Sequence, residues 1–128
     1  MKPARVFLLD TGGCGACAAE VWATVELSDE LVWAPGPAHA DVVALTGSIT
    51  PATREVVLSL YLEFFADQTP VVVVGRCAVD GYPFGQGGVR QIAEIEAARK
   101  VEVCPPLPSI ILDSLLHAVR HWQTNDAA

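Results

Sequence analysis

The chain has 128 residues and a formal net charge of −7, with 52% hydrophobic residues and only 18% charged residues. This length fits one compact domain, with enough apolar material for a packed core and some left over for a partner surface. The few, scattered Lys and Arg residues argue against nucleic-acid binding, and no apolar run reaches the roughly 18 residues that would span a bilayer.

The first part of the chain predicts a strand, a turn and a helix. The apolar run Arg5–Leu9 is typical of a buried strand, and a Gly-rich turn follows it. Apolar residues then recur at helical spacing from Cys17 to Leu27, so we expect the turn to open a helix. A short apolar run, Leu31–Trp33, leads into the Pro-rich loop Ala34–Ala40.

The middle of the chain predicts a second alternation of strand and helix. The Val-rich run Asp41–Leu45 fits a buried strand. We expect the next helix to begin at Pro51, because Pro is favoured in the first turn, with Thr50 as its N-cap, and to end near Asp67. Pro70–Val74 is then a third, uniformly apolar strand.

The last part of the chain has weaker patterns. Gly81–Gly88 is expected to be a loop, Val89–Arg99 a short helix and Lys100–Val103 a weak fourth strand. Several prolines then precede a last helix, Ser109–Trp122. The polar tail 123–128 should fray.

The order of these elements predicts the fold class. Val runs without polar alternation are typical of strands that are covered on both faces. Helices between such strands imply right-handed crossovers and a parallel sheet. We therefore expect a single α/β domain over residues 1–122, with a mostly parallel sheet of about four strands between two layers of helices.

All four cysteines of the chain follow a predicted strand. Cys14 and Cys17 follow the first strand, Cys77 the third and Cys104 the fourth. Because parallel strands end at one edge of a sheet, where open α/β sheets bind their ligands, we expect the four sulfurs to meet there. Cytosolic thiols stay reduced, so this placement predicts a metal or redox site rather than a set of disulfides.

Four converging thiolates leave several kinds of site open. They can bind one zinc ion or one [4Fe-4S] cluster. One C-x-x-C joined by two single cysteines favours a cluster, since zinc ribbons commonly use two close pairs. A third interpretation is a thioredoxin-like dithiol enzyme, with Cys14 and Cys17 as the redox pair and Thr69-Pro70 as a cis-proline loop. That interpretation leaves the other two cysteines without a task.

Four short segments occur in a fixed order: G-C-G-A-C-A-A-E at 13–20, T-G-S-I-T at 46–50, G-R-C-A-V-D-G at 75–81 and C-P-P-L-P at 104–108. Together they resemble the small iron-sulfur subunit of energy-converting, membrane-bound [NiFe] hydrogenases. They also resemble the related cluster-bearing B subunit of NADH:quinone oxidoreductase (complex I). The separated C-x-x-C is more similar to the hydrogenase branch.

The resemblance implies a flavodoxin-like domain that carries one [4Fe-4S] cluster on Cys14, Cys17, Cys77 and Cys104. It implies an electron-transfer subunit that serves a [NiFe]-hydrogenase-like large subunit, beside other iron-sulfur and membrane subunits, with no complete active site of its own. We expect a cytoplasmic protein, peripheral on the membrane as part of such a complex. A complex I-like, quinone-linked subunit is one alternative, and a zinc-stabilised flavodoxin-like interaction module is another.

The resemblance also places further residues near the cluster. Glu20 would lie beside it, where it could bind the partner subunit or influence protons coupled to reduction; the simpler alternative is a first-turn acid that suits the helix dipole. The resemblance also places the loop with Thr46, Gly47 and Thr50 near the cluster. The glycines beside the cysteines, Gly13, Gly15 and Gly75, allow tight turns that bring backbone N–H groups close to the sulfurs. For the two threonines, a turn and an N-cap are the simpler alternative.

Two other patterns predict no site. His117 and His121 are spaced i, i+4, but no third ligand is near them in the sequence, so we expect a solvated helix end. Gly85, Gly87 and Gly88 do not form a G-x-G-x-x-G motif after a strand, so we expect no dinucleotide site.

Overall fold

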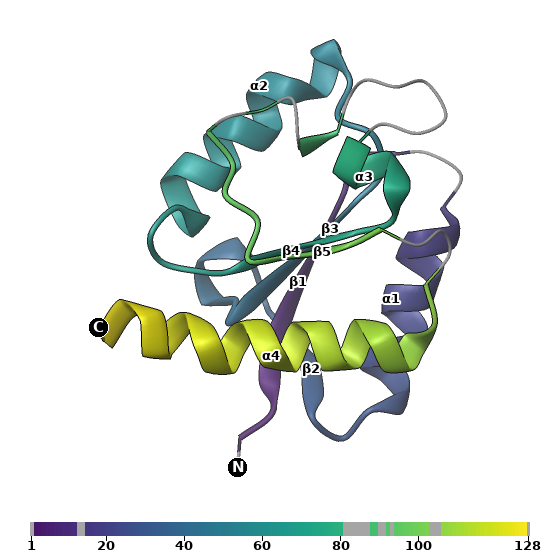
Figure 1. Cartoon of the computed structure of the whole chain (residues 1–128), viewed down its shortest axis with the longest axis vertical. Helices are drawn as coiled ribbons and strands as arrows, with labels where there is room; N and C mark the ends of the chain where they lie inside the picture. The colour runs from purple at the N-terminus through teal and green to yellow at the C-terminus, as the bar shows by residue number, and fades with distance from the viewer. Residues whose placement is uncertain are drawn as a thin grey trace.

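The structure is a computed structural model that describes residues 2–12, 15–80, 88–89, 92, 94–102 and 106–127. Its centre is a five-stranded parallel sheet with the strand order β2-β1-β3-β4-β5 (Figure 1). The strands are β1 (Ala4–Asp10), β2 (Leu31–Trp33), β3 (Val42–Thr46), β4 (Val71–Val74) and β5 (Arg99–Val101). This order is that of the flavodoxin-like, doubly wound α/β folds, so the predicted fold class is confirmed.

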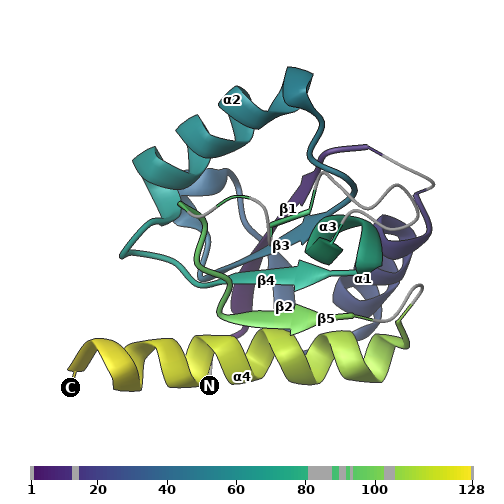
Figure 2. The same ribbon diagram turned by 45° about the horizontal axis from the view of Figure 1, so that its top comes forward.

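Helices cover both faces of the sheet, and Figure 2 shows α4 below it and α2 above it. One layer consists of α1 (Ala16–Leu27) and α4 (Pro108–Ala127). The other layer consists of α2 (Pro51–Leu60), the π-helical turn η2 (Tyr61–Phe65) and the short helix α3 (Arg76–Asp80). A 3-10 turn, η1 (Pro37–His39), lies in the loop before β3.

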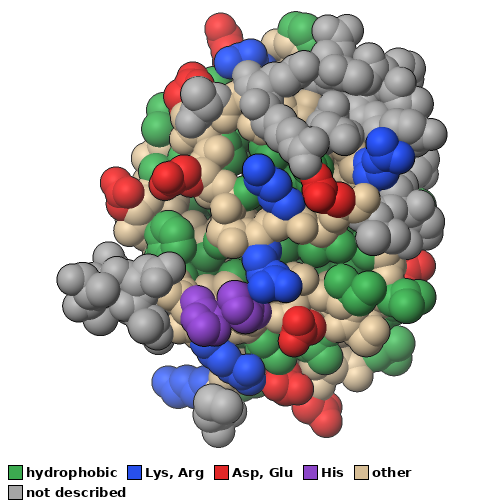
Figure 3. Space-filling model, viewed as in Figure 1, with side chains coloured by type: hydrophobic (Ala, Val, Ile, Leu, Met, Phe, Trp, Pro, Cys, Tyr) green, Lys and Arg blue, Asp and Glu red, His purple; other side chains and the backbone are tan. Residues whose placement is uncertain are grey.

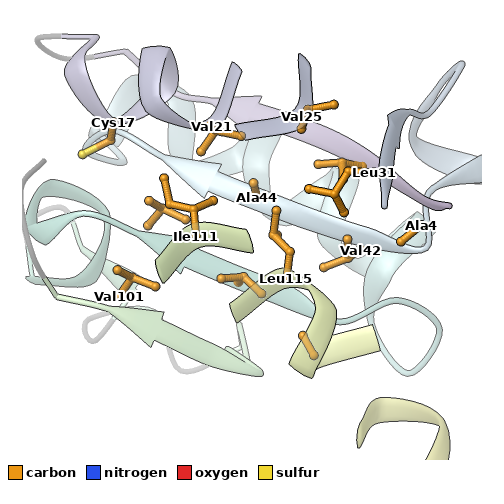
Figure 4. Close-up of a cluster of buried hydrophobic side chains, with 14 residues drawn as sticks. Ala4, Cys17, Val21, Val25, Leu31, Val42, Ala44, Val101, Ile111 and Leu115 are labelled. Atoms are coloured by element: carbon orange, nitrogen blue, oxygen red, sulfur yellow. The ribbon is translucent and has the colours of Figure 1, made fainter. Parts of the chain in front are cut away.

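Each face of the sheet has its own apolar core. Val42 and Ala44 of β3 face the α1 and α4 layer, where they pack in one cluster with Ile111 of α4 (Figure 4). Val43 and Leu45 of the same strand face the α2 layer. Because successive side chains of a strand point to opposite faces, an unbroken apolar run supplies both cores at once.

The edges of the sheet differ from the prediction. Leu31–Trp33 forms β2, which makes five strands in place of about four. A run of three residues is too short to show strand periodicity, and pairing with β1 decides its structure. At the other edge, β5 is Arg99–Val101 rather than Lys100–Val103, and Val103 lies outside the described residues.

The predicted helix Val89–Arg99 is wrong at its described residues 94–99. Residues 94–98 form a turn and a loop, and Arg99 already belongs to β5. Ile92 and Ile95 are both buried in the core beneath α2, and the amide of Ile95 donates to the carbonyl of Ile92. The described residues of this segment therefore contribute to the core through turns rather than through a regular helix.

Two helices also differ from the prediction. The sequence does not predict α3, a five-residue helix that begins one residue after the end of β4. The last helix, α4, continues past Trp122 to Ala127. Residues 123–127 contain neither Pro nor Gly, the residues that commonly end a helix. The single domain over residues 1–122 stays a prediction, and of the predicted loop Gly81–Gly88 only Gly88 is described.

Candidate functional site

A small pocket lies at the carboxyl ends of the parallel strands. It sits between β1 and β3, the pair of neighbouring strands at which the chain changes direction across the sheet. Ligands of doubly wound folds bind at this switch point. We call it the rim pocket, and its described lining residues are Asp10, Gly12, Gly15, Cys17, Ala18, Thr46, Gly47 and Cys77.

The rim pocket brings together two cysteines that are far apart in the sequence. Cys17 lies in the first turn of α1, and its side chain is buried, with 7% exposed. Figure 4 shows it at the edge of the α1 and α4 core, with its sulfur turned away from Val21. Cys77 lies in α3 and is half-buried. Two of the four predicted ligands thus line one pocket.

The turn after β4 is packed directly against the Cys17 sulfur. Gly75 joins β4 to α3 and has a φ of +92°, in the left-handed region that favours glycine. A Cβ added at Gly75 would collide with Cys17 Sγ. This close approach fixes the turn that leads to Cys77 against the helix turn that carries Cys17. Only a residue without a Cβ allows this close approach.

The loops after β1 and β3 are also in close contact. Gly47 has a φ of +84°, and a Cβ added there would collide with the carbonyl oxygen of Gly12. Thr46 is buried, and its hydroxyl donates to Asp10 Oδ1 at 3.1 Å. Sequence reasoning missed Asp10, whose only signal is an acidic residue between a strand and a Gly-rich turn.

The other predicted residues occupy different positions. Gly15 lines the rim pocket and precedes α1 with a φ of +82°. Thr50 is the N-cap of α2, in a reciprocal capping box with Thr53, and is not among the described lining residues of the pocket. Glu20 is half-buried on α1, and it too is absent from that lining. The structure thus supports the cap interpretation for Thr50.

Three predicted residues lie outside the described part of the chain: Gly13, Cys14 and Cys104. Within the described ranges, no three His, Cys, Asp or Glu side chains form a metal-binding group. The structure therefore addresses the four-cysteine hypothesis through Cys17 and Cys77 alone.

The two histidines of α4 form a separate feature. The rings of His117 and His121 are stacked, with centroids 3.9 Å apart. Partial burial, followed by the positive charges of His121 and Arg99, lowers the pKa of His117, although Asp113 acts in the opposite direction. Because α4 continues to Ala127, this pair lies within the helix rather than at its predicted end.

The surface carries exposed apolar side chains. Trp22 of α1 is 53% exposed, and Leu107 and Ile110, at the start of α4, are 65% and 41% exposed. Figure 3 shows further hydrophobic side chains on the same face of the molecule as the histidine pair. Among the helices of the described residues, none has the length and apolarity to cross a membrane.

Comparison with known proteins gives a family match over most of the chain. The family described as "NADH ubiquinone oxidoreductase, 20 Kd subunit" matches residues 14–118. The B subunit of the NADH-quinone oxidoreductase of Carboxydothermus hydrogenoformans is 32% identical over 124 residues, covering 88% of this chain and 73% of the relative. A probable membrane-bound hydrogenase subunit of Pyrococcus furiosus is 28% identical over 130 residues, covering 89% of this chain and 72% of the relative.

Solved structures share the fold. A chain of an NAD+-reducing [NiFe]-hydrogenase in the H2-reduced state superposes with a TM-score of 0.69. The superposition covers 94% of this chain and 93% of the hydrogenase chain, at 15% sequence identity. At this identity the likeness shows the fold alone, and it agrees with the parallel sheet and its two helix layers.

Proposed function

We propose a function from one premise: this chain belongs to the NADH ubiquinone oxidoreductase 20 kDa subunit family, a family of oxidoreductase subunits. Within that family, its own task is to carry one [4Fe-4S] cluster and to pass electrons to or from a catalytic large subunit. The observation that carries this proposal is the convergence of Cys17 and Cys77 on the rim pocket. Cys14 and Cys104 complete the proposed ligand set, because each follows a strand that ends at the same rim.

The described residues fit a cluster site in three ways. Cys17 and Cys77 supply thiols from two different helices, α1 and α3. Gly75 packs against the Cys17 sulfur, and a Cβ at this position would collide with that sulfur. The amino end of α1 lies beside Cys17, and the helix dipole favours negative charge such as that of a thiolate there. When bound, a [4Fe-4S] cluster supplies a redox couple at this rim.

The protein's own contribution is binding, burial and orientation. The four thiolates hold the group, and the apolar core beside Cys17 keeps water from that side of the site. The exposed apolar residues Trp22 of α1 and Leu107, at the start of α4, provide surface for the partner that receives or donates the electron. The chain itself binds no substrate in this proposal.

The partner is proposed to be a [NiFe]-hydrogenase-like large subunit, in a complex with further iron-sulfur and membrane subunits. The separated C-x-x-C, Cys14 and Cys17, supports this branch, as does the P. furiosus relative, whose description is a membrane-bound hydrogenase subunit. A quinone-linked partner of the complex I kind is the second candidate, because the C. hydrogenoformans relative is described as part of an NADH-quinone oxidoreductase. Either complex would hold the chain at the cytoplasmic face of a membrane.

Anaerobic reconstitution with iron and sulfide tests the proposal. We expect about four irons and about four sulfides per chain, brown colour and an EPR signal after reduction. Cys17→Ser and Cys77→Ser should each lower the iron content, whereas Ala19→Ser, at an exposed position of α1, should keep it. A wild-type chain that binds only zinc and stays colourless would refute the cluster.

A further inference from the structure

Asp10 joins two loops at the rim pocket through one carboxylate oxygen. It is the last residue of β1, and in the sheet it lies opposite Thr46, the last residue of β3. Its Oδ1 accepts a hydrogen bond from the amide of Gly12 at 3.1 Å. The same oxygen accepts a second hydrogen bond from the hydroxyl of Thr46, also at 3.1 Å. The side chain of Asp10 therefore extends the contact between β1 and β3 beyond their backbone ladder.

Thr11 adds further hydrogen bonds between the same two loops. Its amide donates to the carbonyl of Thr46 at 3.0 Å. Its hydroxyl lies 2.8 Å from the carbonyl oxygen of Ser48 and 3.0 Å from that of Thr46, so one proton serves two acceptors. We call this set of contacts the rim clasp, and its members are Asp10, Thr11, Gly12, Thr46, Gly47 and Ser48.

The two backbone segments of the rim clasp are in close contact at Gly47. A Cβ added at Gly47 would collide with Gly12 and would lie 2.8 Å from Thr11 Oγ1. Gly47 also has a φ of +84°, which other residues rarely adopt. Only glycine therefore lets the loop after β3 approach the loop after β1 this closely.

The rim clasp is continuous with the cysteines. Asp10, Gly12, Thr46 and Gly47 line the same pocket as Cys17 and Cys77. The loop that the clasp anchors leads from Gly12 directly to the C-x-x-C segment. A fixed loop start restricts where the first cysteine pair can lie, and a carboxylate at the pocket places negative charge beside any group bound there.

On the basis of the proposed function, we propose that Asp10 is a positioning residue of the cluster site. It holds the cysteine loop through the rim clasp, and its charge makes the bound cluster harder to reduce. Reduction adds one negative charge to the site, and a nearby carboxylate opposes that addition. Removal of the charge should therefore raise the reduction potential, whereas removal of a clasp hydrogen bond should loosen the site.

Two isosteric variants separate these effects. Asp10→Asn keeps an oxygen that can accept both hydrogen bonds but removes the charge, so we expect wild-type iron content and a more positive midpoint potential. Thr46→Val removes a clasp hydroxyl and keeps the Asp10 charge. We expect a chelator to remove iron from it about fivefold faster, the factor that corresponds to one ordinary hydrogen bond.

Thr24→Val is the matched control. Thr24 is buried on α1 and donates to the carbonyl of Glu20, away from the described lining of the rim pocket, so this variant removes a comparable hydroxyl elsewhere. An Asp10→Asn protein with the wild-type potential would overturn the charge effect. Equal rates of iron release from Thr46→Val and Thr24→Val would overturn the clasp. A wild-type chain that binds no cluster would instead refute the proposed function.

Discussion

Gly75 is the residue at which the site depends most directly on the lack of a side chain. Gly75→Ala would place a Cβ against Cys17 Sγ and force alanine to adopt a φ of +92°. We expect the free energy of unfolding to fall by about 1–3 kcal/mol, the usual range for such strain. We also expect the reconstituted protein to hold less iron, since the Cys17 sulfur must move. Chemical denaturation and an iron assay measure the two effects.

Gly36 provides the control for that substitution. It has an extended backbone, and nothing lies within 4 Å of a Cβ added there. Gly36→Ala should change the free energy of unfolding by less than about 0.5 kcal/mol and leave the iron content unchanged. If Gly75→Ala behaved like Gly36→Ala, the close packing of the β4 turn on Cys17 would be irrelevant to the site.

The lowered pKa of His117 leads us to expect that folding stability depends on pH. Its pKa is lowered in the folded protein, first by partial burial and then by the charges of His121 and Arg99, from a usual value of 6.5. Below about pH 6.5 the unfolded chain therefore binds more protons at this residue than the folded chain, so the free energy of unfolding falls as the pH falls. Well above that pH, His117 is neutral in both states, and its titration no longer changes the free energy of unfolding. His117→Gln should reduce this loss on the acid side.

The control for the pH experiment is His39→Gln, in the turn η1 rather than on α4. Urea unfolding from about pH 7.5 to about pH 5 should show a smaller acid-side loss for His117→Gln than for His39→Gln and the wild type. Identical pH profiles for all three proteins would contradict the electrostatic account of α4.

At the residue scale, the sequence was sufficient to nominate the cysteines but not Asp10. A C-x-x-C after a strand and two single cysteines after other strands are visible without a structure. An aspartate before glycines is an ordinary turn residue in sequence. The role that we propose for Asp10 depends on its hydrogen bond with Thr46. Thr46 lies opposite Asp10 because of the register between β1 and β3.

At the scale of elements, the N-cap of α2 allows a test that separates an effect on folding stability from an effect on cluster binding. Thr50 accepts a hydrogen bond from the Thr53 amide at 3.3 Å, and its own amide donates to the Thr53 hydroxyl at 3.0 Å. Thr50→Ala should cost about 1 kcal/mol of unfolding free energy, typical of a lost N-cap. The iron content should stay unchanged, because Thr50 is outside the described lining of the rim pocket.

Ser59→Ala, at an exposed position of the same helix, is the matched control and should lose no stability. Denaturation midpoints and iron per chain are compared for the wild type, Thr50→Ala and Ser59→Ala. A Thr50→Ala protein that folds as well as Ser59→Ala but loses iron would show that Thr50 acts at the cluster rather than as a cap.

Elements were predictable where periodicity was long enough. The strands β1, β3 and β4 and the helices α1 and α2 follow from runs of apolar residues and a Pro near the helix start. The short elements β2 and α3 were not, because three or five residues show no period. The prediction of a helix over residues 94–98 was wrong for a different reason. The apolar residues of this segment pack against the core through turns, and the spacing of apolar residues alone does not distinguish such turns from a helix.

At the scale of the whole molecule, the alternation of strands and helices predicted the layers but not the strand order. The order β2-β1-β3-β4-β5 depends on the side of β1 on which each crossover returns. That choice places the switch point between β1 and β3, and so beside Cys17. The site is therefore a consequence of topology, and residues that are adjacent in space there come from the segments that follow three separate strands, β1, β3 and β4.

The central claim is that Cys14, Cys17, Cys77 and Cys104 bind one inorganic cluster at this rim. Diffraction data collected on both sides of the iron absorption edge, from crystals of anaerobically reconstituted protein, test it most directly. We predict a single compact group of iron atoms at the carboxyl rim, with all four cysteine sulfurs bonded to it. Iron elsewhere, zinc in its place, or any one of the four sulfurs directed into the apolar core would contradict the account.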